Sequence, residues 1–183
     1  MVEKLGAGAA IVAVGAEPFV PPVPGVDGTN VRIPETALGH EAELGDKVVI
    51  VGGGMTGLEL AIHLAAMGKT VDVVEMTELL APEGVYTERV DTLRVIGEQP
   101  RIRTHVSTKC LEVTDQGALV ENEQGQQLLE ADSVIFSTGF RSRTVLRDSF
   151  AGCAFDVVNI GDCLAVANIK SATAGALDAV LRI

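Results

Sequence analysis

Tryptophan is absent from this chain of 183 residues, and cysteine is scarce. The three cysteines, Cys110, Cys153 and Cys163, include no C-x-x-C pair. That spacing excludes a dithiol redox centre and a cysteine-held zinc or iron–sulfur site. So few cysteines, odd in number, favour a reducing compartment, and we expect a cytoplasmic protein.

Histidine and basic residues are also few. His40, His63 and His105 have no carboxylate or cysteine at metal-ligand spacing in the sequence. No Ser-His-Asp or paired-carboxylate pattern occurs, so we expect no metal site, no catalytic side chain and no hydrolysis. Lys and Arg number 14 against 25 Asp and Glu, a net charge of -11 without any basic run. We therefore expect no nucleic-acid partner, because phosphate binding needs clustered cations.

Long apolar runs are missing as well. No segment approaches the ~20 apolar residues of a membrane-spanning helix, so we expect no membrane association. The N-terminal stretch has small residues like those of a signal peptide, but Glu3 and the glycine-rich apolar part favour a strand. The hydrophobic fraction of 47% and the charged fraction of 21% are those of an ordinary globular protein.

Short apolar runs alternate with helical patterns along the chain. A continuous run such as VVIV at 48–51 predicts a strand buried on both faces, whereas apolar residues at helical spacing predict an amphipathic helix. Residues 31–46 are predicted as a short helix or loop. The predicted strands are 9–14, 48–51, 70–75, 101–106, 133–139 and 156–163, the helices 55–67, 87–97 and 169–181, and an antiparallel meander 109–114, 118–121 and 127–130.

These elements predict an α/β fold, a three-layer Rossmann-like nucleotide-binding domain. A parallel sheet of three to four strands would carry helices on one face and the three-stranded meander on the other. A partial second α/β segment would be built from both ends of the chain. The stretch 15–28 holds four of the seven prolines and suits a crossing between two domains.

A glycine triplet stands between the strand at 48–51 and the following helix. Gly52, Gly54 and Gly57 satisfy G-x-G-x-x-G. The first permits a tight turn, the second leaves room for a pyrophosphate, and the third lets the helix pack closely on the sheet. Gly53 lies in the same loop and is included in the expected cofactor-binding set. The alternative is a turn that merely packs a helix on a sheet.

The residues around this loop indicate which nucleotide it would bind. Met55 and Thr56 open the helix, whose backbone N–H groups and partial positive charge suit phosphate. Glu75 ends the next strand, 18 positions after Gly57, where a carboxylate accepts hydrogen bonds from the ribose 2′-OH. The carboxylate would repel a 2′-phosphate, and the next residues, MTELLAP, contain no Arg or Lys. We therefore favour NADH over NADPH.

Three further segments resemble the pyridine nucleotide-disulfide oxidoreductase family of FAD- and NAD(P)-binding flavoproteins. VAVGAEPFVPPVPGVDG (12–28) is similar to that family's crossover into its NAD domain, and FSTGFRSRT (136–144) resembles its second crossover, with Ser142-Arg143 where Pro-Asn is usual. VVNIGDC (157–163) resembles its late I-G-D motif. The branch that the glycine segment resembles most is that of NADH:flavin oxidoreductases, 2,4-dienoyl-CoA reductases and enoate reductases. A stand-alone NADH oxidase is the alternative.

The resemblance implies roles for three more residues. Asp162 matches the aspartate that contacts the ribityl chain of FAD. Glu59 matches the glutamate of G-x-G-x-x-G-x-E, which lies near the nicotinamide and flavin, and its alternative is a solvated carboxylate in the first turn of the helix. Gly139 would bring backbone close to the nicotinamide ribose, or would simply form a turn after a strand.

The resemblance also implies a division of the chain. Residues 1–44 would be a strand segment of an FAD domain with a crossover linker, 45–140 the NAD(P)-binding domain, and 141–183 the returning FAD segment. The FAD domain's own G-x-G-x-x-G is not found before residue 9. We therefore expect FAD to be bound only in the intact enzyme, with missing N-terminal flavin and substrate domains as partners. The surfaces left exposed predict a homodimer.

The expected function is to position NADH for hydride transfer to FAD within a flavin-dependent oxidoreductase. The isolated chain would be inactive. Two alternatives belong to other classes: a non-catalytic module that reads only ADP, and a structural domain that binds no nucleotide.

Overall fold

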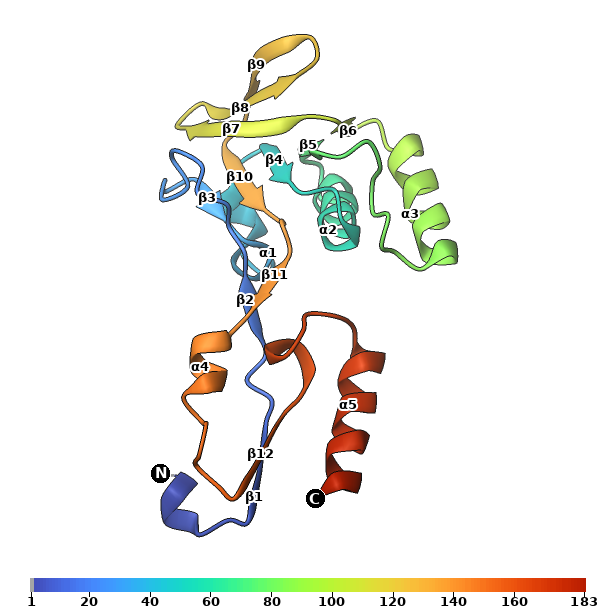
Figure 1. The fold of residues 1–183 in the computed structure, drawn as a ribbon. Helices are drawn as coiled ribbons and strands as arrows, with labels where there is room; N and C mark the ends of the chain where they lie inside the picture. The colour runs from blue at the N-terminus through green and yellow to red at the C-terminus, as the bar shows by residue number, and fades with distance from the viewer. Residues whose placement is uncertain (1) are drawn as a thin grey trace. The chain divides into compact units, whose positions relative to one another are not determined.

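The computed structural model describes residues 2–183, and the chain divides into two compact units (Figure 1). The central unit comprises residues 20–139. The terminal unit is formed by the two ends of the chain, residues up to 19 and residues 140–183. The prediction that both chain ends build a second α/β segment is therefore confirmed.

A five-stranded parallel sheet forms the middle layer of the central unit. Its order is β3-β10-β4-β5-β6, where β3 is Val31–Arg32, β10 Ser133–Phe136, β4 Lys47–Val51, β5 Thr70–Val74 and β6 Ile102–His105. The predicted number of three to four strands was too low. The missed strand is β3, a two-residue strand inside 31–46, which pairs with β10 at one edge. So short a strand has no alternation of its own to reveal it.

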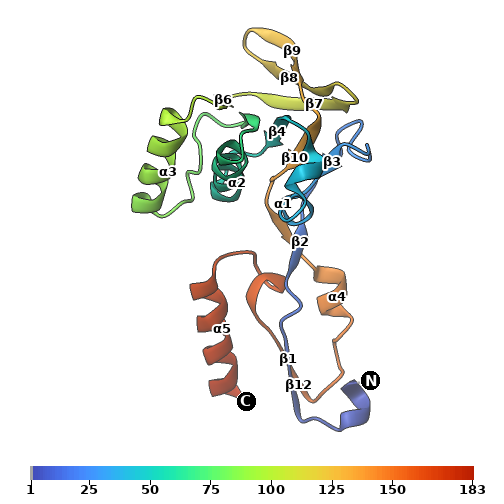
Figure 2. The ribbon, with the colours of Figure 1, turned by 180° about the vertical axis from the view of Figure 1, so that it is seen from behind.

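Helices cover one face of this sheet. α2 (Met55–Ala66) and α3 (Tyr86–Glu98) follow β4 and β5, and the short α1 (Pro34–Ala37) also contacts α2 (Figure 2). A buried core lies between these helices and the sheet, and its largest fully buried members include Leu44, Ile50, Leu58, Leu64 and Ile135. Each such side chain contributes about 1.5–3 kcal/mol relative to its exposed state.

The antiparallel meander covers the other face. It consists of β7 (Lys109–Thr114), β8 (Gly117–Asn122) and β9 (Gly125–Glu130), paired in that order. Val49, Val74 and Phe136 of the sheet form a second core with Val113 and Val120 of the meander. The three-layer arrangement predicted from sequence is therefore confirmed.

The terminal unit contains two small two-stranded sheets. β1 (Ala9–Val12) pairs in parallel with β12 (Asp156–Asn159), and β2 (Ala16–Pro18) pairs antiparallel with β11 (Phe140–Ser142). An ion pair of 2.7 Å between Arg141 and Glu17 joins the second pair. The helical elements are the 3-10 turns η1 (Val2–Leu5) and η3 (Gly161–Cys163), α4 (Thr144–Asp148) and α5 (Ile169–Arg182), with a further 3-10 turn, η2 (Glu41–Leu44), in the central unit.

The compact units do not divide the chain where the family resemblance does. Residues 20–44 fold with the central unit because Val20, Val23 and Val26 pack against its second core and β3 joins its sheet. The boundaries at 44/45 and 140/141 refer to family domains, and they stay a prediction.

Candidate functional site

The carboxyl ends of three neighbouring strands define the candidate site of the central unit. β4 follows β10 in the sheet and precedes β5, and all three run parallel. From β4 the chain moves outward to β5 and β6 on one side, while β10 and β3 lie on the other, so the strand order reverses beside β4. Open α/β sheets bind ligands at such a switch point.

Two glycines of the loop after β4 are required by close backbone packing. Gly52 has a φ of 116°, and a methyl group there would collide with the carbonyl oxygen of Ser137, which follows β10. A methyl group on Gly57 would in turn collide with the carbonyl oxygen of Gly52. Any larger residue at either position would push the helix or the neighbouring strand away. These contacts place the start of α2 directly against the strand ends.

Gly54 serves a different purpose from these two. It is the N-cap of α2, and no side-chain hydrogen bond caps the helix. Apart from its chain neighbours and the helix backbone, only one heavy atom of the described residues, Oε1 of Glu83, lies within 4 Å of where its methyl group would stand. The backbone N–H groups of the first helical turn, which have no intrahelical acceptors, therefore open onto space beside Gly54. A cradle of this kind accepts phosphate oxygens.

Glu75 is held against the same loop. Its Oε2 accepts a hydrogen bond of 2.8 Å from the backbone N–H of Gly53. Its Oε1 accepts from the backbone N–H and the hydroxyl of Thr77, at 2.8 and 2.9 Å. A carboxylate offers about four lone-pair positions, so this one keeps acceptor capacity for a further donor. Glu75 thus lies against the glycine loop, and its role as a ribose acceptor stays a prediction.

The segment after Glu75 folds back onto the glycine loop. The N–H of Ala81 donates to the carbonyl of Gly53 at 2.8 Å, and Leu80 packs against Gly53. Arg89, at the start of α3, donates its Nε to the carbonyl of Leu80 at 2.9 Å. Ala81 is fully buried and has a φ of 44°. These contacts fix the segment 77–85 as one wall of the site, which sequence reasoning did not predict.

The remaining candidates of the central unit lie around the same edge. Met55 is half-buried and contacts Gly84, whereas Thr56 is exposed in the first turn of α2. Glu59 is exposed in the second turn and forms no hydrogen bond with a described side chain. Gly139 follows β10 with a φ of 88° and open space around it.

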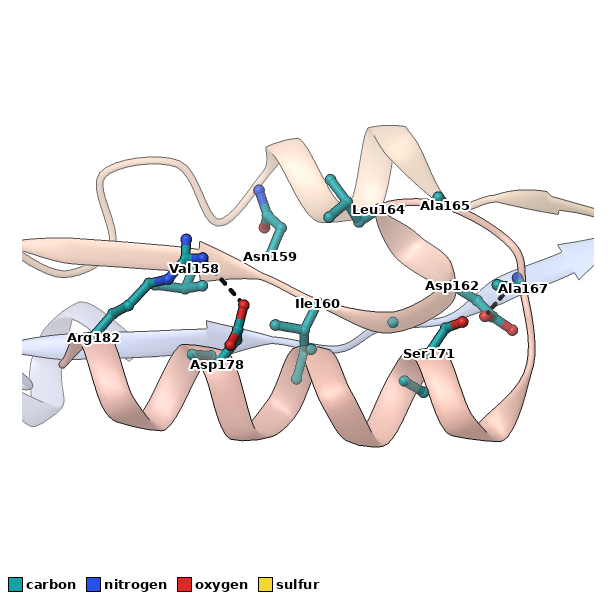
Figure 3. Close-up of a pocket in the computed structure, with 14 residues that line it drawn as sticks. Val158, Asn159, Ile160, Asp162, Leu164, Ala165, Ala167, Ser171, Asp178 and Arg182 are labelled. Carbon is teal, nitrogen blue, oxygen red and sulfur yellow. Dashed lines mark hydrogen bonds and ion pairs between the residues drawn. The ribbon is translucent and has the colours of Figure 1, made fainter.

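Asp162 belongs to the terminal unit, in the turn after β12. Its Oδ1 accepts a hydrogen bond of 3.2 Å from the N–H of Ala167, and its carbonyl accepts one of 2.6 Å from the hydroxyl of Ser142. It lines a cavity of about 410 Å³ between β12 and α5 (Figure 3). Asn159 lines the same cavity, and its side-chain oxygen is buried without a hydrogen-bond partner among the described residues. Asp162 therefore offers a carboxylate acceptor to a polar ligand, whereas the buried oxygen of Asn159 is closed off from the cavity (Figure 3).

The three histidines each lie beside a carboxylate, and for His63 and His105 that carboxylate is distant in the sequence. His40 Nδ1 lies 3.2 Å from Glu43, and His63 Nε2 lies 3.0 Å from Glu41. The pKa of Glu41 is lowered to about 2, chiefly by hydrogen bonds from backbone N–H groups and then by His63. The expectation that the histidines have no carboxylate partner was wrong: His40 pairs with a residue three positions on, and His63 and His105 pair with carboxylates that meet them through the fold.

The third histidine belongs to a charged cluster on the meander face of the sheet. Asp72, on β5, is 5% exposed and accepts from His105 at 2.7 Å and from Arg103 at 2.6 and 2.9 Å. Burial alone would raise the pKa of Asp72, but the hydrogen bonds from His105 and Arg103 hold it below its usual value. The cluster joins β5 to the edge strand β6.

The side chains and helices of the described residues meet the requirements of neither a metal site nor a membrane span. Within residues 2–183, no arrangement of three or more His, Cys, Asp and Glu side chains is suited to a metal ion. None of the helices described is both long enough and apolar enough to cross a membrane.

Known proteins resemble nearly the whole chain. It is 33% identical over 153 residues to a bilirubin reductase of Mediterraneibacter gnavus, which covers 84% of this chain and 24% of that protein. It is 29% identical over 176 residues to a cinnamate reductase of Clostridium sporogenes, covering 93% and 26%. The chain thus spans about a quarter of the length of these curated relatives.

The fold is shared with a solved structure of 2-naphthoyl-CoA reductase. The TM-score is 0.85 at 24% sequence identity, covering 93% of this chain and 26% of that one. Residues 2–163 match the pyridine nucleotide-disulphide oxidoreductase family. Together with the glycine loop, its answering Glu75 and the second segment built from both chain ends, this match confirms that the chain belongs to the pyridine nucleotide-disulphide oxidoreductase family.

Proposed function

We propose that this chain is the nucleotide-binding part of a larger flavin-dependent oxidoreductase and that it positions NADH for hydride transfer to FAD. The observation that carries the proposal is the contact of Glu75 with the glycine loop, 2.8 Å from the N–H of Gly53, at the switch point of the sheet. The proposal that the chain is part of a larger oxidoreductase is supported by its family membership and by reductase relatives that are about four times as long.

The proposed binding mode assigns each part of NADH to a part of this edge. The pyrophosphate would rest beside Gly54, against the backbone N–H groups of Met55 and Thr56. The adenosine ribose would donate a hydroxyl to the free acceptor capacity of Glu75. The nicotinamide half would extend across the switch point toward Gly139, with Glu59 on the exposed side of α2. The site residues act by binding and orienting.

Charge supports NADH over NADPH. Glu75 would face the 2′ position, where a phosphate adds about two negative charges. A carboxylate held by three hydrogen bonds, to Gly53 and Thr77, cannot easily move aside. The nearest Arg along the chain, Arg89, already donates Nε to the carbonyl of Leu80.

The terminal unit would contribute to a flavin site. FAD, when bound, accepts the hydride from C4 of NADH at its N5 atom. The Asp162 carboxylate, which lines the cavity between β12 and α5, fits the hydroxyl groups of a ribityl chain. The chain has one G-x-G-x-x-G, and the geometry above commits it to the central unit. We therefore propose that FAD binds tightly only when the other domains of the enzyme are present, and that the chain alone is inactive.

Exposed apolar side chains of the terminal unit fit partners of this kind. On α5, Leu177, Val180 and Leu181 are 63%, 63% and 76% exposed. A helix with such a face is normally covered. The missing flavin domain of the same enzyme would cover it, and a second copy would do so in isolation, which favours a homodimer. A cytoplasmic location remains part of the proposal.

The test is a titration with NADH and NADPH, followed by nucleotide fluorescence, for which the absence of tryptophan leaves a clean background. We expect saturable NADH binding, weaker NADPH binding, and about a tenfold loss of NADH affinity in Glu75→Gln, because a hydrogen bond to a charged group contributes about 1.5–3 kcal/mol. Glu78→Gln, an exposed carboxylate of the same segment, is the matched control.

Two outcomes would favour the other classes. Equal affinity for ADP and NADH would indicate a module that reads only the adenine half. No binding of either nucleotide to a folded protein would leave a structural role. The circular dichroism spectrum of each variant shows whether its fold is intact.

A further inference from the structure

A second carboxylate faces the glycine loop besides Glu75. The Oε1 atom of Glu83 lies 3.1 Å from the position that a methyl group on Gly54 would take. No other residue of the described chain, apart from the immediate neighbours and the helix backbone, places a heavy atom within 4 Å of that point. The Glu83 carboxylate is therefore the one described side chain that borders the opening beside Gly54.

The position of Glu83 follows from the backbone around it. The N–H of Ala81 is anchored to the carbonyl of Gly53 at 2.8 Å, and the N–H of Gly84 returns to the carbonyl of Ala81 at 3.1 Å. Gly84 packs on Met55, the first residue of α2, because a methyl group there would lie 3.0 Å from the Met55 sulfur. Glu83 is thus held between two residues that touch the glycine loop.

The chemistry of this place favours an anion. The N-terminus of α2 carries a partial positive charge and free N–H groups, and a nearby carboxylate is stabilised there. No described residue forms a hydrogen bond or ion pair with the Glu83 side chain, and the side chain is exposed. The carboxylate is therefore free to rotate into water. Its negative charge is the same sign as that of a pyrophosphate.

We propose that Glu83 occupies the pyrophosphate position when no nucleotide is bound, so that a dinucleotide has to displace its carboxylate. This inference rests on the proposed function of the glycine loop. Glu83 would set the affinity of the site rather than take part in the reaction. The penalty is common to every ligand with a pyrophosphate, so NADH and ADP are affected alike. In contrast, Glu75 would bind the ribose and would therefore determine the preference for NADH over NADPH.

The test compares Glu83→Gln with Glu78→Gln in the same chain. Both variants remove one negative charge from the segment 77–85, but only Glu83 lies at Gly54. We expect Glu83→Gln to bind NADH and ADP about fivefold more tightly than the unaltered protein at low salt, and the gain to shrink at high salt. Glu78→Gln should change either affinity less than about twofold.

A second measurement needs no nucleotide. The amide resonances of Gly54, Met55 and Thr56 are followed by NMR while the pH is lowered through the carboxylate range. If Glu83 lies over these groups, their shifts follow its protonation, and the difference between the unaltered protein and Glu83→Gln isolates that contribution from Glu75. Equal titration curves in the two proteins would overturn the contact.

The outcomes separate this inference from the proposed function. NADH binding that Glu83→Gln leaves unchanged, or that Glu78→Gln raises equally, overturns the role of Glu83 and leaves the cofactor site intact. If neither protein binds NADH or ADP, the proposed cofactor site is overturned, and the proposed competition between Glu83 and the nucleotide is overturned as well. The contact of Glu83 with the start of α2 would still stand in that case if the amide shifts depend on Glu83.

Discussion

Replacing Asp72 by alanine should lower the free energy of unfolding of the central unit more than the loss of an exposed ion pair would. Asp72 is 5% exposed and joins β5 to the edge strand β6 through Arg103 and His105. The substitution removes three hydrogen bonds, two from the guanidinium and one from the imidazole. It leaves both partners without their shared acceptor.

The expected magnitude follows from how exposed those partners are. Removing one member of a fully buried ion pair costs about 3–5 kcal/mol, because the remaining charge is stranded. The side chain of Arg103 is 64% exposed, so water can replace part of what it loses. His105 is 21% exposed and is rehydrated less easily. We therefore expect a loss of about 2 kcal/mol in the free energy of unfolding.

The pH dependence has a definite sign. Because the hydrogen bonds hold the pKa of Asp72 below its usual value despite its burial, its ionised form is favoured in the folded state. Such a group stabilises the protein above its unfolded pKa of about 3.9, and that contribution is lost as the pH falls through the lower folded pKa. The difference between the two proteins should therefore be largest near neutral pH and shrink at acidic pH.

Urea unfolding followed by circular dichroism measures the effect. The control is Asp91→Ala, which breaks an exposed pair with Arg94 on α3, where Asp91 is 71% exposed. That variant should lose less than about 1 kcal/mol. Equal losses in the two variants, or a difference for Asp72→Ala that does not depend on pH, would show that the cluster does not stabilise the sheet as argued.

Three shorter predictions concern other parts of the chain. Gly57→Ala should lower NADH affinity at least about tenfold and reduce the melting temperature, because its methyl group would meet the carbonyl of Gly52; an unchanged titration would contradict the close packing. Cys110 should react more slowly than Cys153 with a thiol reagent at pH 8, since burial raises the pKa of the Cys110 thiol; mass spectrometry of each site decides it. Asn168→Ala should cost about 1 kcal/mol, because Asn168 Oδ1 caps α5 at 3.0 Å from the N–H of Ser171, and a urea midpoint unaltered by the change would exclude a stabilising cap.

Features encoded within one local segment were predicted well from sequence. The helix at 55–67 and the strand at 48–51 differ from α2 and β4 by one residue at most, since a buried run and a helical period each leave a clear local pattern. The spacing also predicted an acidic residue, Glu75, at the end of the second strand of the βαβ unit, and the structure holds that residue against the glycine loop. Its role in binding the ribose stays a prediction.

Features made by residues distant in sequence were missed. β2 and β11 pair across more than 120 residues, and neither is long enough to show alternation. Arg103 and His105 reach Asp72 only because β6 lies beside β5 in a particular register, which periodicity does not specify. Glu83 is missed for the same kind of reason. The hydrogen bond from Ala81 to Gly53, rather than any motif, brings it to Gly54.

The two candidate sites differ in how completely this chain supplies them. Every residue proposed to bind NADH lies within 20–139, where the sheet is covered on both faces and the glycine loop is backed by Glu75. Asp162 lies in a unit whose parallel sheet has only two strands and whose helix α5 exposes Leu177, Val180 and Leu181. The unit that is covered on both faces is therefore also the unit that contains all the residues proposed to bind its ligand. The nucleotide site should be formed by this chain alone, whereas tight flavin binding should require the same additional domains that would cover α5.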